Sequence, residues 1–138
     1  MRSAEILNRA TGRYLFDTNI VIALFAGDVN IISRLHETVQ IFISANVLGE
    51  LYFGAQKSQH QKKNMSRIRQ FAQSVILLKC DSETALLYGQ IKNSLKQIGN
   101  PIPENDIWIA ATAMQHKLML ITRDNHFSNI KDLQIQKW

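Results

Sequence analysis

Short, mostly apolar runs that alternate with helix-like segments constrain the fold of this chain more than any other feature. Four runs are clear, at residues 14–16, 40–43, 75–78 and 118–121, and residues 133–135 form a weaker fifth. Their continuous apolar character is typical of strands buried on both faces, as in a parallel sheet covered by helices. We therefore expect an α/β domain with three layers, α/β/α, and a parallel sheet of four to five strands.

The segments between these runs carry helix signals. Thr18 is a candidate N-cap for a first helix, and Ser44 for a helix that ends near Lys57. Asp81 or Ser82 is a candidate cap for a long helix that ends near Ile98. The other expected helices cover residues 31–35, 59–73 and 107–116.

Length and composition exclude several protein classes. With 138 residues the chain fits one domain, since domains commonly have about 100–150 residues. No apolar run approaches the roughly 18 residues that a membrane-spanning helix needs, and the N-terminus lacks the apolar core of a signal peptide. The single cysteine, Cys80, cannot form an internal disulfide, and we expect it to be a small buried residue. We expect a cytoplasmic protein that has no membrane partner.

The net charge of +5 is unevenly distributed. Residues 51–80 contain six basic side chains and no acidic one, whereas the rest of the chain is close to neutral. This basic stretch is either an ordinary solvated helix face or a surface that binds phosphates. Its basic residues are Lys57, Lys62, Lys63, Arg67, Arg69 and Lys79.

Four acidic residues are expected at one edge of the sheet. Asp17 and Asp124 lie just past the ends of the first and fourth strands, Glu50 lies about two turns into the helix after the second strand, and Asp106 lies in the first turn of the helix that precedes the fourth. Ligands of parallel α/β sheets bind at the carboxyl ends of the strands, so the four side chains are candidates for one pocket.

Clustered carboxylates point to a metal ion. Four carboxylates cannot all stay ionised at close range without a counter-charge, and oxygen ligands select a hard cation such as Mg²⁺, or Mn²⁺ in its place. The histidines show no paired ligand spacing, so zinc is disfavoured. A bound Mg²⁺ lowers the pKa of a coordinated water and stabilises charge on a phosphate under attack, which suits phosphodiester hydrolysis.

Four motifs, in this order, resemble those of PIN-domain ribonucleases, and above all the VapC toxin subfamily of type II toxin–antitoxin modules. The motifs are Phe16-Asp17-Thr18-Asn19, Gly49-Glu50-Leu51, Asn105-Asp106-Ile107-Trp108 and Thr122-Arg123-Asp124. The resemblance covers residues 13–138, which we interpret as a PIN domain, and leaves residues 1–12 as an N-terminal extension.

The resemblance implies a metal-dependent endoribonuclease that cuts cellular RNA, inhibits translation and is neutralised by a VapB-like antitoxin. It also implies a homodimer or a larger assembly with the antitoxin. Position by position, the catalytic and metal-binding acids are Asp17, Glu50, Asp106 and Asp124. The supporting residues are Thr18, Asn19 and Thr122.

Once a metal ion offsets these four acids, seven acidic side chains remain against sixteen basic ones. This balance favours the interpretation of the basic stretch as a surface that binds RNA or a partner protein. The candidate RNA-binding residues are Lys57, Lys62, Lys63, Arg67, Arg69 and Arg123.

Two other functions stay open at this point. One is a PIN-like module that binds RNA or protein without cutting it. The other is a phosphatase of the haloacid dehalogenase type, which needs a second acid where this chain has Asn19. Among single residues, we expect His126 at a surface turn and Glu104 in solvent, and Tyr52 and Trp108 in the core or a dimer interface.

Overall fold

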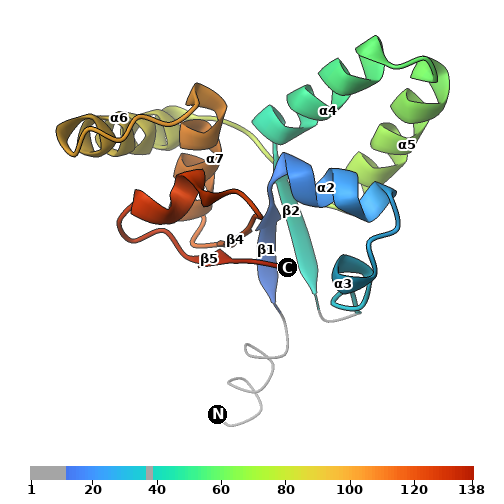
Figure 1. Ribbon diagram of the computed structural model, residues 1–138, viewed down its shortest axis with the longest axis horizontal. Coiled ribbons are helices and arrows are strands. Elements are labelled where there is room, and N and C mark those ends of the chain that lie inside the picture. Colours follow the sequence, from blue (N-terminus) through green and yellow to red (C-terminus); the bar gives the residue numbers. More distant parts are fainter. Residues whose placement is uncertain (1–11, 37–38) are drawn as a thin grey trace, which may run out of the picture.

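The computed structural model describes residues 12–36 and 39–138, and a five-stranded parallel sheet lies at its centre (Figure 1). The strand order is β3-β2-β1-β4-β5, and every neighbouring pair is parallel. This confirms the predicted α/β fold. The predicted N-terminal extension lies outside the described residues, apart from Gly12. The strands are β1 (Arg13–Phe16), β2 (Gln40–Ser44), β3 (Ile76–Leu78), β4 (Met119–Ile121) and β5 (Ile135–Gln136).

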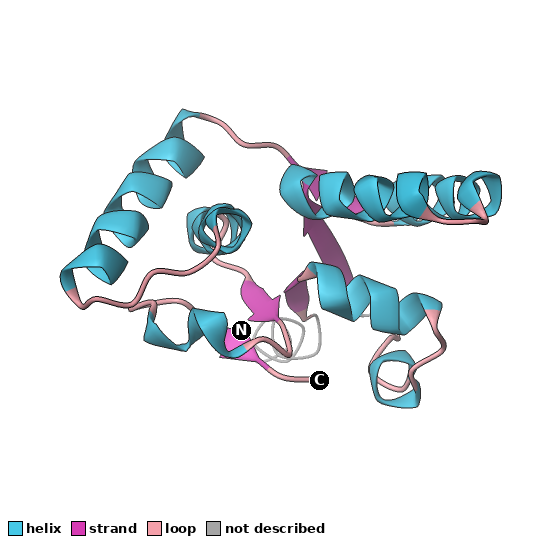
Figure 2. Cartoon of the chain, turned by 45° about the horizontal axis from the view of Figure 1, so that its top comes forward, coloured by secondary structure: helices cyan, strands magenta, loops and turns pink. Residues whose placement is uncertain are grey.

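Helices flank the sheet in two groups. In Figure 1, α2, α4 and α5 lie to one side of β1 and β2, and α6 and α7 lie to the other. Helices α4 and α5 pack against each other, and they overlap in the turned view of Figure 2. A short 3₁₀-helix, η1, follows β4. The helices are α2 (Thr18–Phe25), α3 (Val29–Ile32), α4 (Ala45–Lys57), α5 (Gln61–Ser74), α6 (Ser82–Gln97), α7 (Glu104–Gln115) and η1 (Asn125–Asn129).

Polar side chains fix where three of these helices begin. Ser44 caps α4 as predicted, because its hydroxyl accepts a hydrogen bond from the Val47 backbone N–H at 3.1 Å. Asp81 caps α6 in a reciprocal capping box with Thr84. The prediction that Thr18 caps α2 is wrong: Asp17 is the cap, and its Oδ1 accepts from the Thr18 N–H at 2.8 Å.

Helix α7 begins three residues earlier than predicted, at Glu104 instead of Ile107. The backbone carbonyl of Pro103 accepts from the N–H groups of Asp106 and Ile107, so the first turn is closed by main chain alone. Glu104 and Asp106 both lie in this turn, where negative charge interacts favourably with the helix dipole. The early start places Asp106 at the helix end that faces the site.

The core is built around the interior strands of the sheet. Leu15 and Phe16 of β1 and Leu120 and Ile121 of β4 are fully buried, as continuous apolar strands should be. The prediction of a buried Cys80 is wrong, since this residue lies exposed just beyond the edge strand β3 and its thiol donates to Asn46 Oδ1 at 3.1 Å. Across the described residues, no helix combines the length and the apolar character needed to cross a bilayer.

Candidate active site

The four acids predicted from the sequence lie together at the carboxyl edge of the sheet. Asp17 follows β1 and Asp124 follows β4, while Glu50 is carried by α4 and Asp106 by the first turn of α7. The negative charges of Asp106 and Glu50 act on Asp17, and that of Asp124 acts on Asp106. Segments from four parts of the chain therefore form one electronegative site.

Asp17 is the most deeply buried of these acids, with 4% of its surface exposed. Its Oδ1 accepts from the Thr18 N–H at 2.8 Å, and its Oδ2 accepts from the Thr122 hydroxyl at 2.7 Å. Burial raises the pKa of Asp17, the two hydrogen bonds oppose that rise, and the nearby charges of Asp106 and Glu50 add to it. The carboxylate is thus held in place by neutral donors that do not cancel its charge.

Glu50 is held by two side chains from other elements. The Thr18 hydroxyl donates to Glu50 Oε2 at 2.9 Å, and the Asn105 amide donates to Glu50 Oε1 at 2.9 Å. Thr18 thereby links the start of α2 to α4, and Asn105 links α7 to α4. The sequence places Asn105 in a motif but does not predict its contact with Glu50, because a contact across 55 positions leaves no local signal.

The other two supporting residues differ in what they contact. The Thr122 hydroxyl donates to Asp17 and accepts from the Asp124 backbone N–H at 3.0 Å, so it ties two of the acids together. Asn19 lies exposed in the first turn of α2. Among the hydrogen bonds of the described residues, none joins Asn19 to Asp17.

His126 lies between two of the acids, a placement that sequence analysis misses. Its side chain is half exposed, as expected of a turn residue, but its Nδ1 is 2.9 Å from Asp106 Oδ2 and 3.1 Å from Asp124 Oδ1. Its backbone N–H also donates to Asp124 Oδ1 at 2.9 Å. The hydrogen bond with Asp106 raises the pKa of His126. The spacing of two residues after Asp124 is the only signal for this placement in the sequence.

The side chains present fit a divalent cation. One ligand atom each from Asp106, Asp124 and His126 lies within 4.8 Å of the other two. In residues 12–36 and 39–138, no lysine or arginine forms an ion pair with the four acids: Arg123 pairs with Asp28 at 2.9 Å, and Lys92 pairs with Glu104. Carboxylate oxygens with no cationic partner other than a histidine are a suitable donor set for Mg²⁺ or Mn²⁺.

Within the described residues, none of the candidate RNA-binding residues forms an ion pair with the four acids, and some have other partners. Arg67 donates to the Phe25 carbonyl and lies over the Phe25 ring, and Lys57 lies over the Phe53 ring. Arg123 donates to the Trp138 carbonyl at 2.7 Å besides its ion pair with Asp28, which favours a structural role for this side chain. Lys62, Lys63 and Arg69 are exposed on α5.

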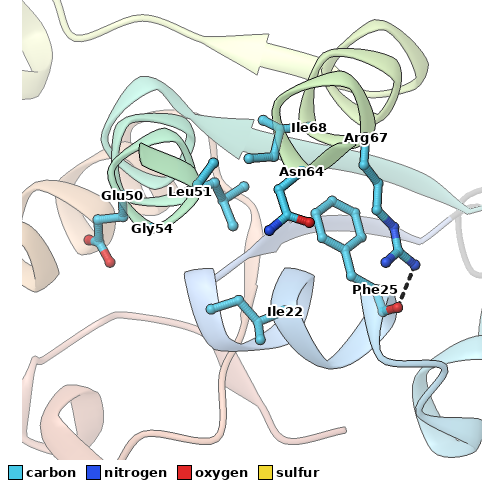
Figure 3. Close-up of a pocket in the computed structure, with 9 residues that line it drawn as sticks. Ile22, Phe25, Glu50, Leu51, Gly54, Asn64, Arg67 and Ile68 are labelled. Atoms are coloured by element: carbon cyan, nitrogen blue, oxygen red, sulfur yellow. Dashed lines mark hydrogen bonds between the residues drawn. The ribbon is translucent and has the colours of Figure 1, made fainter. Parts of the chain in front are cut away.

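A pocket of about 260 Å³ between α2, α4 and α5 connects the two regions. Figure 3 shows Glu50 at one end of this pocket and Arg67 at the other. The apolar residues that line it between them are Ile22, Phe25, Leu51, Ala55 and Ile68.

Comparisons with known proteins agree on one family. The family model of the PIN domain matches residues 14–133. Ribonuclease VapC2 of Haemophilus influenzae is 33% identical over 91% of this chain and 98% of its own length. Two solved structures are also similar. VapBC2 from Rickettsia felis, bound to a DNA fragment from its promoter, has a TM-score of 0.85 and 27% identity over 91% of this chain and 98% of that one. VapBC-1 from nontypeable Haemophilus influenzae has a TM-score of 0.81 and 34% identity over the same shares.

Proposed function

We propose a function from one premise: this chain belongs to the PIN-domain family and to its VapC ribonucleases. It is an endoribonuclease toxin of a VapBC-type module. The four acids are proposed to bind the catalytic metal ion. The observation that carries the metal assignment is the cluster of Asp17, Asp106 and Asp124 without a lysine or arginine partner among the described residues. We assign Mg²⁺ as the metal, with Mn²⁺ as a substitute.

The proposed division of labour follows from how each acid is held. Asp106 and Asp124 offer carboxylate oxygens on either side of His126, and Asp17 lies beside them with its orientation fixed by Thr18 and Thr122. When bound, the metal ion lowers the pKa of a water molecule and stabilises negative charge on the phosphate. Glu50, fixed by Thr18 and Asn105, is available to accept a hydrogen bond from the attacking water.

The proposed substrate is RNA. The exposed lysine and arginine side chains of α5 are proposed to bind its phosphates. The relatives named ribonuclease VapC support the choice of substrate, and the excess of positive charge over residues 51–80 supports the anchor. RNA bound along α5 would approach the acids past the pocket that Glu50 and Arg67 border.

The proposed protein partners are a VapB-like antitoxin and a second copy of this chain. Similar solved structures are VapBC assemblies, which supports the antitoxin. The apolar pocket between α2, α4 and α5 opens beside Glu50, so an antitoxin segment seated there would lie next to the acids. The homodimer, or a larger assembly with the antitoxin, is inferred from the family resemblance.

Cleavage of RNA by the purified protein tests this proposal. We expect cleavage in Mg²⁺, none in EDTA, and recovery when Mg²⁺ is restored. Asp17→Asn, Glu50→Gln and Asp106→Asn should each reduce the rate on the order of 100-fold or more, since each removes a charge from the site. Glu83→Gln, an exposed residue of α6 outside the site, is the control and should cut at the wild-type rate.

Two results would contradict the proposal. If Asp17→Asn cuts as fast as the wild type, or if cleavage continues in EDTA, the metal site is assigned wrongly. RNA binding that persists in EDTA, with no cleavage in any divalent metal, would identify a binding module instead.

A further inference from the structure

Among the described residues that contact the acids, His126 is the one for which neither the motif nor the proposed chemistry gives a role. Its ring contacts the acids directly: Nδ1 is within hydrogen-bond distance of one oxygen of Asp106 and one oxygen of Asp124. An imidazole between two carboxylates has two physical explanations. Either Nδ1 carries a proton and hydrogen-bonds the carboxylates in the place of the metal ion, or it is a ligand of that ion.

The distances are those of hydrogen bonds, and they also fit the spacing of ligand atoms around a metal ion. In octahedral coordination with bonds of about 2.1 Å, adjacent ligand atoms are separated by about 3.0 Å. Nδ1 of His126 is 2.9 Å from Asp106 Oδ2 and 3.1 Å from Asp124 Oδ1. The imidazole nitrogen can therefore occupy a coordination position adjacent to both oxygens without a change of rotamer.

The backbone fixes this arrangement. Asp124 is the N-cap of η1, and its Oδ1 accepts from the His126 N–H, so the two side chains leave the same short turn. Asp106 comes from the closed first turn of α7, which has its own contacts with η1. Two separate elements thus present three ligand atoms to one point, as expected of a preorganised site.

We propose that His126 binds the catalytic metal ion through Nδ1, next to Asp106 and Asp124, and that this nitrogen ligand shifts the preference of the site from Mg²⁺ toward Mn²⁺. The shift follows from ligand chemistry, since Mg²⁺ binds oxygen almost exclusively while imidazole suits transition metals. The inference rests on the proposed metal-dependent function and specifies the metal at the same site.

Binding of Mn²⁺ alone, without RNA, tests the inference. The full-length protein, loaded with Mn²⁺, is studied by titration calorimetry and by electron spin echo measurements that detect nitrogen bound to Mn²⁺. The wild type should show a bound nitrogen, and His126→Ala should lose it. The Mn²⁺ dissociation constant of His126→Ala should rise about tenfold or more, while that for Mg²⁺ changes much less.

Two further variants sharpen the test. His126→Asp replaces the nitrogen ligand with oxygen, so the nitrogen signal should vanish and the ratio of Mn²⁺ to Mg²⁺ affinity should fall. His60→Ala changes an exposed histidine at the start of α5 and should keep both the signal and the wild-type affinities.

Other outcomes overturn the inference. If His126→Ala binds Mn²⁺ more tightly, the ring is a cation that competes with the metal. If the nitrogen signal is absent in the wild type or persists in His126→Ala, His126 is not a ligand. In each of these cases Mg²⁺-dependent RNA cleavage by the wild type would leave the proposed function intact. A wild-type protein that binds neither metal would overturn both.

Discussion

Asp17 combines deep burial with a charge that no lysine or arginine of the described structure pairs with. Its two oxygens accept hydrogen bonds from a backbone N–H and a hydroxyl, and two further acids lie close enough to raise its pKa. Such an arrangement costs folding free energy when no cation is bound. In a metal-binding site this cost arises because the Asp17 carboxylate is held in position before the metal ion binds.

The metal-free protein should therefore gain stability when Asp17 is neutralised. Burial in the folded protein raises the pKa of Asp17 above its ordinary value of 3.8. The native state therefore binds a proton at Asp17 more tightly than the unfolded chain does, and the ionised carboxylate lowers the free energy of unfolding. The penalty of the charged carboxylate is fully present above the raised pKa, and it disappears as the pH falls through that pKa toward 3.8. Asn at this position keeps the cap and the hydrogen bond from Thr18.

Urea unfolding in EDTA measures this effect. At pH 7.5 we expect Asp17→Asn to unfold at a higher urea concentration than the wild type, and the difference to shrink toward pH 4. Added Mg²⁺ should stabilise the wild type more than the variant. Asp132→Asn, at an exposed position away from the site, should follow the wild type. A variant that is less stable at pH 7.5, or a difference that does not change with pH, would contradict the account.

At the residue scale, the sequence predicts the four acids but only part of their surroundings. Asp17 directly follows the apolar strand β1 and Asp124 lies three residues past the end of β4, so their position at the sheet edge can be read from the strand pattern alone. The contacts of Asn105 and His126 depend on the directions in which α7 and η1 present their side chains. Neither direction is encoded in local spacing, so these two contacts could not be predicted.

At the scale of the elements, α4 and α5 connect the acid site to the basic surface. Helix α4 carries Glu50, and α5 packs against α4 and carries most of the basic stretch. The start of α4 could be predicted because Ser44 is a strong N-cap, whereas the start of α7 could not, because main-chain groups alone close its first turn. Arg67 packs against Phe25 of α2, so it contributes to the packing between the helices as well as to the charge of α5.

Reversing the exposed charges of α5 should weaken RNA binding and leave the fold intact. The test variant is Lys62→Glu, Lys63→Glu and Arg69→Glu combined, which spares Arg67 and its interaction with α2. We expect a lower affinity for RNA. The slope of the logarithm of the binding constant against the logarithm of the salt concentration should be shallower by roughly 0.7 for each phosphate that the variant no longer neutralises. Binding of labelled RNA in EDTA at several salt concentrations measures both.

The matched control carries the same change of charge elsewhere. Lys96, Lys117 and Lys131 lie at the end of α6 and in the loops before β4 and β5, and their combined change to Glu should affect RNA binding much less. Equal reductions of affinity in the two triple variants would mean that only net charge matters. Unchanged RNA binding by the α5 variant would show that this face of α5 is an ordinary solvated helix surface.

At the scale of the whole molecule, the strand order explains why the acids meet. The central strands β1 and β4 are neighbours although about a hundred positions separate them, and the residues that follow them, Asp17 and Asp124, share the site. The sequence pattern predicts a parallel sheet but not its order β3-β2-β1-β4-β5, because apolar strands of similar composition do not specify their neighbours. The order follows from how the helices pack on both faces of the sheet.

Mapping of RNA 5′ ends after brief expression tests the central claim most directly. The wild type and Asp17→Asn are expressed to equal levels in the same cells, and the new 5′ ends in total RNA are sequenced. The account predicts ends that appear with the wild type and are absent with Asp17→Asn. The same ends at the same abundance in both samples would contradict it, because the buried acid of the site would then not be needed to cut RNA.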